Sequence, residues 1–177
     1  MSKARVATLW LDGCSGCHMS FLDIDGKLVD LAPRIELVYG PLVDFKEYPE
    51  GVDVALVEGA VASDEDVHKI KEVRAKTKIL VALGDCAVTS NVPGMRNPFG
   101  PAAVLDRAYK ENVSLAPGWP DKDIPALRKR VTPLHEVVPV DVFVPGCPPP
   151  AEAIFFVVAE LLEGRIPDPT SLTRFGK

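Results

Sequence analysis

The stretch RVATLWLDGCSGCHMS (residues 5–20) joins an apolar run typical of a β-strand to a turn rich in glycine and cysteine. A segment with a helical pattern follows directly, over residues 17–32. Two of the chain's four cysteines, Cys14 and Cys17, lie in this turn, each beside a glycine. A strand, a glycine-lined turn and a helix in this order predict a ligand site at the carboxyl end of the first strand.

The same alternation of β-rich runs and helical segments continues along the chain. Further strands are predicted at residues 35–40, 52–59, 78–84 and 140–146. One helix is expected at 63–77, with a cap at Ser63, acidic residues in its first turn and lysines at its end, Lys76 and Lys78. Another is expected at 151–164, where apolar side chains nearly encircle the helix and predict burial in the core or under a partner. The alternation predicts an α/β fold with an open parallel sheet and helices on both faces.

The pattern breaks down between residues 91 and 139, where eight prolines interrupt the chain. Only 102–109 and 124–130 have a helical pattern in this region. We expect a single domain over residues 1–177, with a proline-rich excursion at about 91–139 that crosses the surface. Loops of this length are usually functional or lie against another subunit.

The other two cysteines also follow predicted strands. Cys86 comes after the strand at 78–84 and Cys147 after the strand at 140–146, and Gly84 and Gly146 precede them closely. Because the carboxyl ends of parallel strands meet at one edge of the sheet, we expect the four thiols to converge there. Glycine allows the backbone to approach a bulky group and to present amide donors to anionic sulfurs.

Four types of cysteine site and an FMN site are alternatives for this pattern. A disulfide is not expected, because a chain without an export signal stays in a reducing compartment. A thioredoxin-like pair would leave Cys86 and Cys147 unexplained. Structural zinc suits four thiolates, although such sites usually combine two close Cys-x-x-Cys pairs. An FMN site would need a first loop rich in serine and threonine, where this chain has Cys14 and Cys17. An iron–sulfur cubane is large enough to be enclosed by thiolates from separate strand ends.

Charge and composition argue against some kinds of partner and location. The net charge is −5 and basic residues form no cluster, which argues against nucleic-acid binding. The sequence shows neither an export signal nor an apolar run long enough for a transmembrane segment. We therefore expect a cytoplasmic protein.

Four ordered motifs resemble the small subunit of nickel–iron hydrogenases, in particular the cytoplasmic NAD-reducing (bidirectional) kind. They are LDGCSGCHMSFLD (11–23), LVEGAV (56–61), LGDCAVTSNVPGMRN (83–97) and VPGCPPPAEAI (144–154). The resemblance implies a flavodoxin-like domain that binds one four-iron, four-sulfur cluster through Cys14, Cys17, Cys86 and Cys147.

The resemblance also implies a division of labour among subunits. The nickel–iron centre is expected on a separate large subunit, and FMN and NAD on diaphorase subunits that carry further iron–sulfur clusters. Longer members of the family have a second domain with more cysteines, which this chain lacks, so electrons are expected to leave through another subunit. Many relatives have a proton-passing acid two positions after the second cysteine, where this chain has Met19.

A related subunit of complex I shares the fold and the PGCPP motif (145–149), but it has adjacent cysteines in its first motif. The separation of Cys14 and Cys17 therefore favours the hydrogenase. We expect an electron-transfer small subunit that passes electrons from hydrogen oxidation toward NAD reduction. The alternatives are a complex I-like subunit that passes electrons to quinone and a non-enzymatic zinc-binding scaffold.

Five further residues have candidate roles. Glu58, at the end of a strand, is a candidate proton relay or a purely structural acid. His18 is expected to pack at a subunit interface, and His68 and His135 to lie on the surface. Asp85 is expected to cap the turn that follows it.

Overall fold

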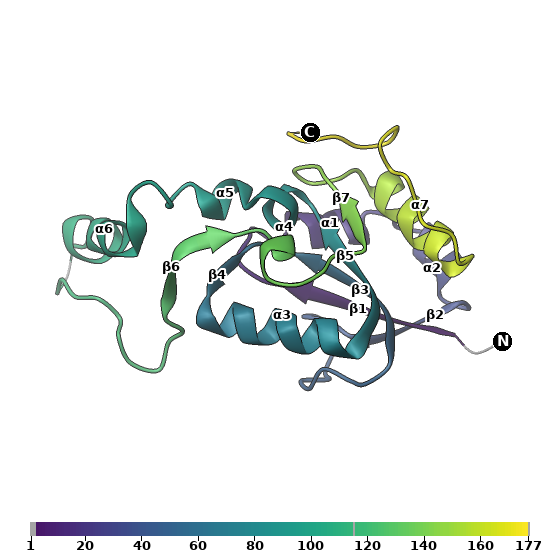
Figure 1. The fold of residues 1–177 in the computed structure, drawn as a ribbon, viewed down its shortest axis with the longest axis horizontal. Helices are drawn as coiled ribbons and strands as arrows, with labels where there is room; N and C mark the ends of the chain where they lie inside the picture. Colours follow the sequence, from purple (N-terminus) through teal and green to yellow (C-terminus); the bar gives the residue numbers. More distant parts are fainter. Residues whose placement is uncertain (1–2, 115, 177) are drawn as a thin grey trace.

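The computed structural model describes residues 3–114 and 116–176, which build a five-stranded parallel sheet covered by helices (Figure 1). The strand order is β2-β1-β3-β5-β7. The strands are β1 (Ala4–Trp10), β2 (Ile35–Tyr39), β3 (Val52–Glu58), β5 (Thr77–Leu83) and β7 (Val142–Val144). Counted along this sheet alone, the order is the flavodoxin-like 2-1-3-4-5, with its switch point between β1 and β3. The predicted α/β fold class is confirmed.

Strand β3 shows why the sheet is covered on both faces. Its apolar side chains point alternately to opposite sides, since successive residues of a strand face opposite ways. Val54 and Leu56 join one buried cluster with residues of the helices Gly16–Leu22, Lys27–Leu31 and Ala151–Leu162. Ala55 and Val57 join another with residues of the helices Asp64–Lys76 and Asp85–Thr89. A nearly continuous apolar run is therefore stable only between two layers of helices.

The helices of the first layer are α1 (Gly16–Leu22), α2 (Lys27–Leu31) and α7 (Ala151–Leu162). The sequence pattern predicts one helical segment over 17–32, but the structure divides it into α1 and α2. The divide falls at Asp25, which has a positive φ of 56°, and Gly26. Helix α7 buries one face completely, including Ile154, whereas Phe155 and Phe156 are only partly covered.

The other layer contains α3 (Asp64–Lys76) and the short α4 (Asp85–Thr89). The predicted cap of α3 is confirmed: the Asp66 amide donates to Ser63 Oγ (3.1 Å), and the Ser63 amide donates to Asp66 Oδ2 (2.8 Å). The helix ends at Lys76, so Lys78 belongs to β5.

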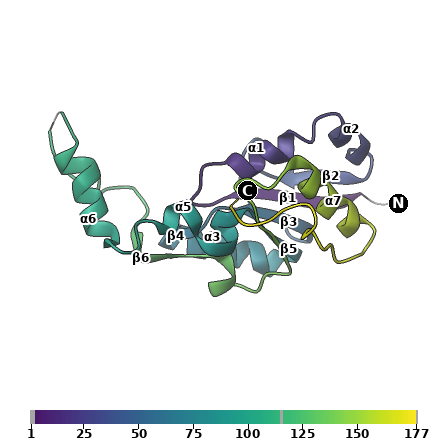
Figure 2. The same ribbon diagram turned by 90° about the horizontal axis from the view of Figure 1, so that it is seen from above.

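The segment between β5 and β7 leaves the sheet after α4, and around Gly100–Asp106 it extends away from the sheet as an arm (Figure 2). It contains α5 (Asn91–Gly94), α6 (Gly100–Asp106), the π-helical turn η1 (Arg107–Glu111), β6 (Leu127–Thr132) and the 3-10 turn η2 (Leu134–Glu136). The helix expected at 102–109 is confirmed in α6 and η1. The single-domain boundaries stay a prediction.

The helical expectation for 124–130 is wrong, because β6 is a strand that pairs antiparallel with β4 (Val61–Ser63). The pairing partner lies more than sixty residues earlier in the sequence, beyond the reach of local periodicity. Asn97 adds a second long-range support: its Oδ1 accepts from the Val131 amide (2.8 Å), and its Nδ2 donates to the Val131 carbonyl (3.0 Å).

None of the helices in the described ranges has the length and apolar character needed to cross a membrane.

Candidate functional site

The four cysteines come from the carboxyl ends of three strands. Cys14 lies in the loop after β1, and Cys17 lies in the first turn of α1. Cys86 is in α4, directly after β5, and Cys147 follows β7. All four are free thiols; Cys17 and Cys86 are buried, whereas Cys14 and Cys147 are exposed. The site is thus buried at Cys17 and Cys86 and exposed to solvent at Cys14 and Cys147.

The thiols lie close enough to influence one another's ionisation. Burial raises the pKa of Cys17, and the negative charges of Glu58, Cys86 and Cys14 raise it further. Burial also raises the pKa of Cys86, with added contributions from Cys147, Cys14 and Glu58. The predicted convergence of these side chains therefore agrees with their mutual electrostatic effects.

No group of three or more Cys, His, Asp or Glu side chains within the described part of the chain is placed to hold a single metal ion.

Glycines make room for the sulfurs. Gly84 has φ +83°, and a Cβ there would lie 2.1 Å from Cys17 Sγ. A Cβ at Gly16 would lie 3.2 Å from Cys14 Sγ. Asn91 Nδ2 donates to Cys147 Sγ (3.5 Å). Four soft thiol donors, close backbone and a side-chain amide donor fit a bulky anionic group such as an iron–sulfur cluster.

Glu58 lies beneath Cys17 at the end of β3 and is 4% exposed. Its Oε2 accepts from the His18 backbone amide (2.9 Å), and its Oε1 is buried with no partner among the described residues. Burial raises the pKa of Glu58, although hydrogen bonds from His18 and Cys17 oppose this effect. The carboxyl group therefore supports the start of α1 and keeps one oxygen available.

The interface role expected for His18 is wrong, because its side chain is buried against Thr8 and Trp10 of β1. Its Nδ1 accepts from Trp10 Nε1 (2.7 Å), which leaves the ring proton on Nε2, 3.5 Å from Thr8 Oγ1. Burial lowers the pKa of His18, so the ring is neutral at neutral pH. Sequence reasoning missed Trp10, whose place at a strand end carries no motif.

Two of the other candidate residues lie where the sequence predicts, and the third has a different role from the one expected. His68 and His135 are exposed, as predicted. Asp85 makes no capping bond to α4. Its carboxylate instead accepts from the backbone amides of Gly146 and Gly176, so the prediction of a local cap is wrong. Both donors lie more than sixty residues away in the sequence, which is why local reasoning missed them.

The fold and this edge define a flavodoxin-like α/β protein with four cysteines at the carboxyl ends of its parallel strands. The chain belongs to the family described as NADH ubiquinone oxidoreductase, 20 Kd subunit, whose model matches residues 14–161.

Known relatives place the chain on the hydrogenase side of this family. It is 41% identical to the NAD-reducing hydrogenase HoxS subunit delta of Cupriavidus necator, over 98% of this chain and 86% of that protein. It is 40% identical to a subunit of the F420-non-reducing hydrogenase of Methanocaldococcus jannaschii, over 92% of this chain but only 57% of that protein. A crystal structure of an NAD+-reducing [NiFe]-hydrogenase in the H2-reduced state contains a chain with a TM-score of 0.92 and 41% identity, covering 98% of this chain and 99% of that one. The resemblance to the small subunit of NAD-reducing nickel–iron hydrogenases is confirmed.

Proposed function

We propose that this chain is the electron-transfer small subunit of an NAD-reducing nickel–iron hydrogenase. The observation that carries the proposal is the position of four free cysteines directly after three parallel strands, with electrostatic coupling among their side chains. Similarity to the hydrogenase delta subunit along nearly the whole chain supports it.

Cys14, Cys17, Cys86 and Cys147 are the proposed ligands of one four-iron, four-sulfur cluster. Such a cluster supplies one-electron transfer when bound. Burial raises the pKa of Cys17 and Cys86, so both remain thiols unless a cation offsets the charge of the thiolates. Gly84 leaves room for the Cys17 sulfur, and the side-chain amide of Asn91 donates to the Cys147 sulfur.

Metal analysis of the anaerobically purified assembly tests this assignment. Beyond the iron of the partner subunits, we expect about four irons per copy of this chain and no zinc. Cys86→Ser and Cys147→Ser should each remove the cluster signal in electron paramagnetic resonance, whereas the exposed-site control Val29→Ala should keep it. Zinc without iron would instead support the zinc-scaffold alternative.

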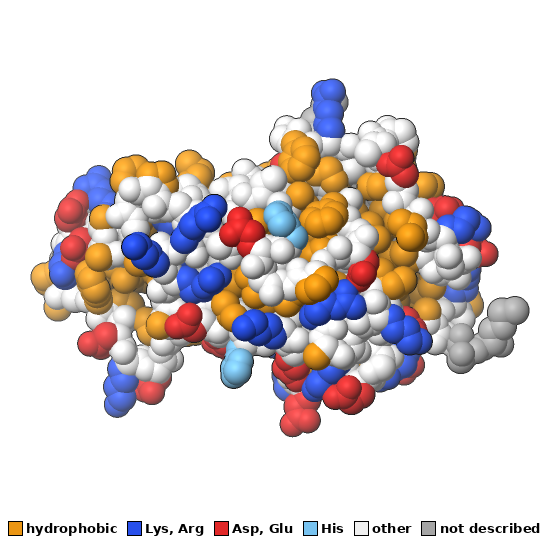
Figure 3. Space-filling view, viewed as in Figure 1, with side chains coloured by type: hydrophobic (Ala, Val, Ile, Leu, Met, Phe, Trp, Pro, Cys, Tyr) orange, Lys and Arg blue, Asp and Glu red, His pale blue; other side chains and the backbone are white. Residues whose placement is uncertain are grey.

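The proposed partners are a large subunit with the nickel–iron centre and diaphorase subunits with iron–sulfur clusters, FMN and NAD. Exposed apolar side chains support a partner surface near the site: Met19 is 53% exposed in α1, and Val92 and Met95 are 59% and 71% exposed just after α4. Figure 3 shows apolar side chains in several groups on one face, over the arm and around β7 and α7.

A dimer with the large subunit should reduce an artificial dye with hydrogen but should not reduce NAD, because one cluster cannot carry electrons as far as a flavin on another subunit. Adding the diaphorase subunits should restore NAD reduction. Reduction of a quinone by the assembly in place of NAD would favour the complex I-like alternative. A cytoplasmic location belongs to the same proposal, and fractionation of cells would test it.

Glu58 is the proposed proton relay, because its Oε1 is buried close to Cys17 and has no hydrogen-bond partner among the described residues. Met19 has no titratable group, so Met19→Leu should leave hydrogen–deuterium exchange by the assembly unchanged. Glu58→Gln keeps the acceptor for the His18 amide and should slow the exchange. If Glu58→Gln exchanges at the normal rate, Glu58 has only its structural role.

A further inference from the structure

Among the residues that the structure describes, the buried carboxylate of Asp85 is bound by backbone amides alone. It lies directly before Cys86 and is 5% exposed. Its Oδ1 accepts from the Gly146 amide (2.6 Å), and its Oδ2 accepts from the Gly176 amide (2.8 Å). Within residues 3–114 and 116–176 no salt bridge to Asp85 is formed. The two amide groups therefore carry the stabilisation of this charge.

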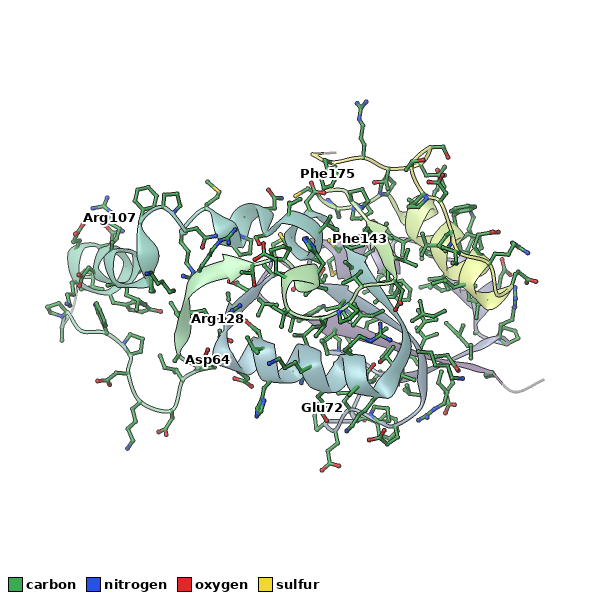
Figure 4. The ribbon with its side chains drawn as sticks, viewed as in Figure 1. Asp64, Glu72, Arg107, Arg128, Phe143 and Phe175 are labelled. Carbon is green, nitrogen blue, oxygen red and sulfur yellow. The ribbon has the colours of Figure 1, made fainter. Side chains whose placement is uncertain are left out.

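The two amides belong to segments that lie far from Asp85 and from each other in the sequence. Gly146 directly precedes Cys147, and Gly176 lies in the segment after α7, here called the return segment (residues 165–176). In Figure 1 the return segment passes back from α7 to a position beyond the end of β7, and Figure 4 labels Phe175 in it above Phe143 of β7. One side chain thus joins a cysteine loop to a distant part of the chain.

Further contacts hold the return segment against the Cys147 loop. Thr173 Oγ1 donates to the Pro145 carbonyl. A Cβ at Gly146 would lie 2.9 Å from Thr173 Oγ1, so the two segments are in close contact. On the other side of the loop, the Asp85 amide donates to the Gly146 carbonyl (2.8 Å). The loop before Cys147 is therefore held between α4 and the return segment.

The chemistry of this arrangement requires a carboxylate. Each of its two oxygens accepts one N–H, and a charged acceptor makes these bonds about twice as strong as neutral ones. An asparagine offers one carbonyl oxygen only, so its NH2 group would face the second backbone N–H with no acceptor.

We propose that Asp85 is a positioning residue that ties the return segment to the Cys147 loop and so keeps Cys86 and Cys147 in register for the cluster. This inference rests on the proposed function for its consequence, because it assumes that the two thiols share one ligand group. The hydrogen bonds that tie Asp85 to Gly146 and Gly176 are observed in the structure and do not depend on the proposed function.

Two variants test the tie in the full assembly, purified anaerobically. Asp85→Asn removes one acceptor, and a chain ending at Arg174 removes the Gly176 donor while Asp85 and Thr173 stay. Asp53→Asn is the matched control, since Asp53 Oδ2 also accepts a backbone amide, from Arg5 (2.8 Å), but at the start of β3.

Two measurements are compared: the rate of iron release to a chelator, followed as loss of the electron paramagnetic resonance signal that Cys86→Ser lacks, and amide hydrogen exchange at Gly146. Loss of a hydrogen bond to a charged group should speed iron release roughly tenfold or more in Asp85→Asn. The shortened chain should also lose iron faster, and both variants should lose protection at Gly146 while β3 stays protected. Asp53→Asn should behave like the unaltered chain in both measurements.

The inference is overturned if both variants keep the normal rates, or if the shortened chain behaves as the control. Loss of protection that extends to β3 would mean general destabilisation and would also overturn it. If the unaltered assembly contains no iron, the proposed function fails, but exchange at Gly146 still decides whether the tie exists.

Discussion

Replacement of Gly84 by alanine would place a methyl carbon where the Cys17 sulfur now lies. The built Cβ is 2.1 Å from Cys17 Sγ, whereas ordinary contacts begin near 3.4 Å. One of the two groups must therefore move by more than about 1 Å. Because Gly84 has φ +83° and ψ 162°, a region almost closed to other residues, the backbone is strained as well.

The two costs can be estimated separately. The backbone strain costs about 1–3 kcal/mol, and overpacking of a filled site costs about 1–3 kcal/mol more. Together they remove about 2–6 kcal/mol, a large share of the 5–15 kcal/mol by which a typical domain is stable. Displacement of Cys17 should also lower the iron content of the assembly.

Pulse proteolysis along a urea series would report the unfolding of this chain within its assembly. Gly164→Ala is the control, since Gly164 has φ +72° but no atom within 4 Å of a built Cβ. A Cys17→Ala background removes the sulfur, so the cost of Gly84→Ala should fall there to the backbone strain alone. Equal costs with and without the sulfur, together with a full complement of iron in Gly84→Ala, would refute the reasoning.

Three further predictions concern packing, pH and the arm. Ile154→Ala should destabilise the chain by about 2–5 kcal/mol in urea unfolding, because Ile154 is fully buried on the inner face of α7, while the exposed Glu152→Ala should change stability by less than about 0.5 kcal/mol. Burial raises the pKa of Tyr48 to about 12 from 10.0, despite the hydrogen bond to Thr77 that opposes the shift. Folding therefore favours the neutral phenol. The contribution of Tyr48 to the free energy of unfolding is intact below pH 10, and about 2–3 kcal/mol of this free energy is lost as pH rises to 12. Tyr48→Phe should lack this alkaline loss, and parallel slopes of stability against pH for both chains would contradict the assignment. Asn97→Ala should leave the Val131 amide and carbonyl without partners, so hydrogen exchange should increase in β6 while β3 stays protected; an unchanged β6 would show that Asn97 does not support the strand.

Local patterns in the sequence determined the sheet and the position of the cysteines. The apolar run of β3 predicts a strand buried on both faces, since every side chain there must avoid water. Ser63 and Asp66 predict the start of α3, because a capping box depends on residues three apart. The order of the cysteines after successive strands places them at one edge, because parallel strands share their direction.

Tertiary structure decided the features that depend on distant partners. Strand β6 forms because β4 lies beside it, which overrides the helical pattern of 124–130. Burial of His18 follows from the packing of α1 over Trp10, and its neutral state follows from that burial. Asp85 accepts hydrogen bonds from amides that lie sixty-one and ninety-one residues away, so only the folded chain shows which groups its carboxylate binds. Periodicity reports contacts within a few residues, whereas these roles arise from contacts that the sequence separates and the fold brings together.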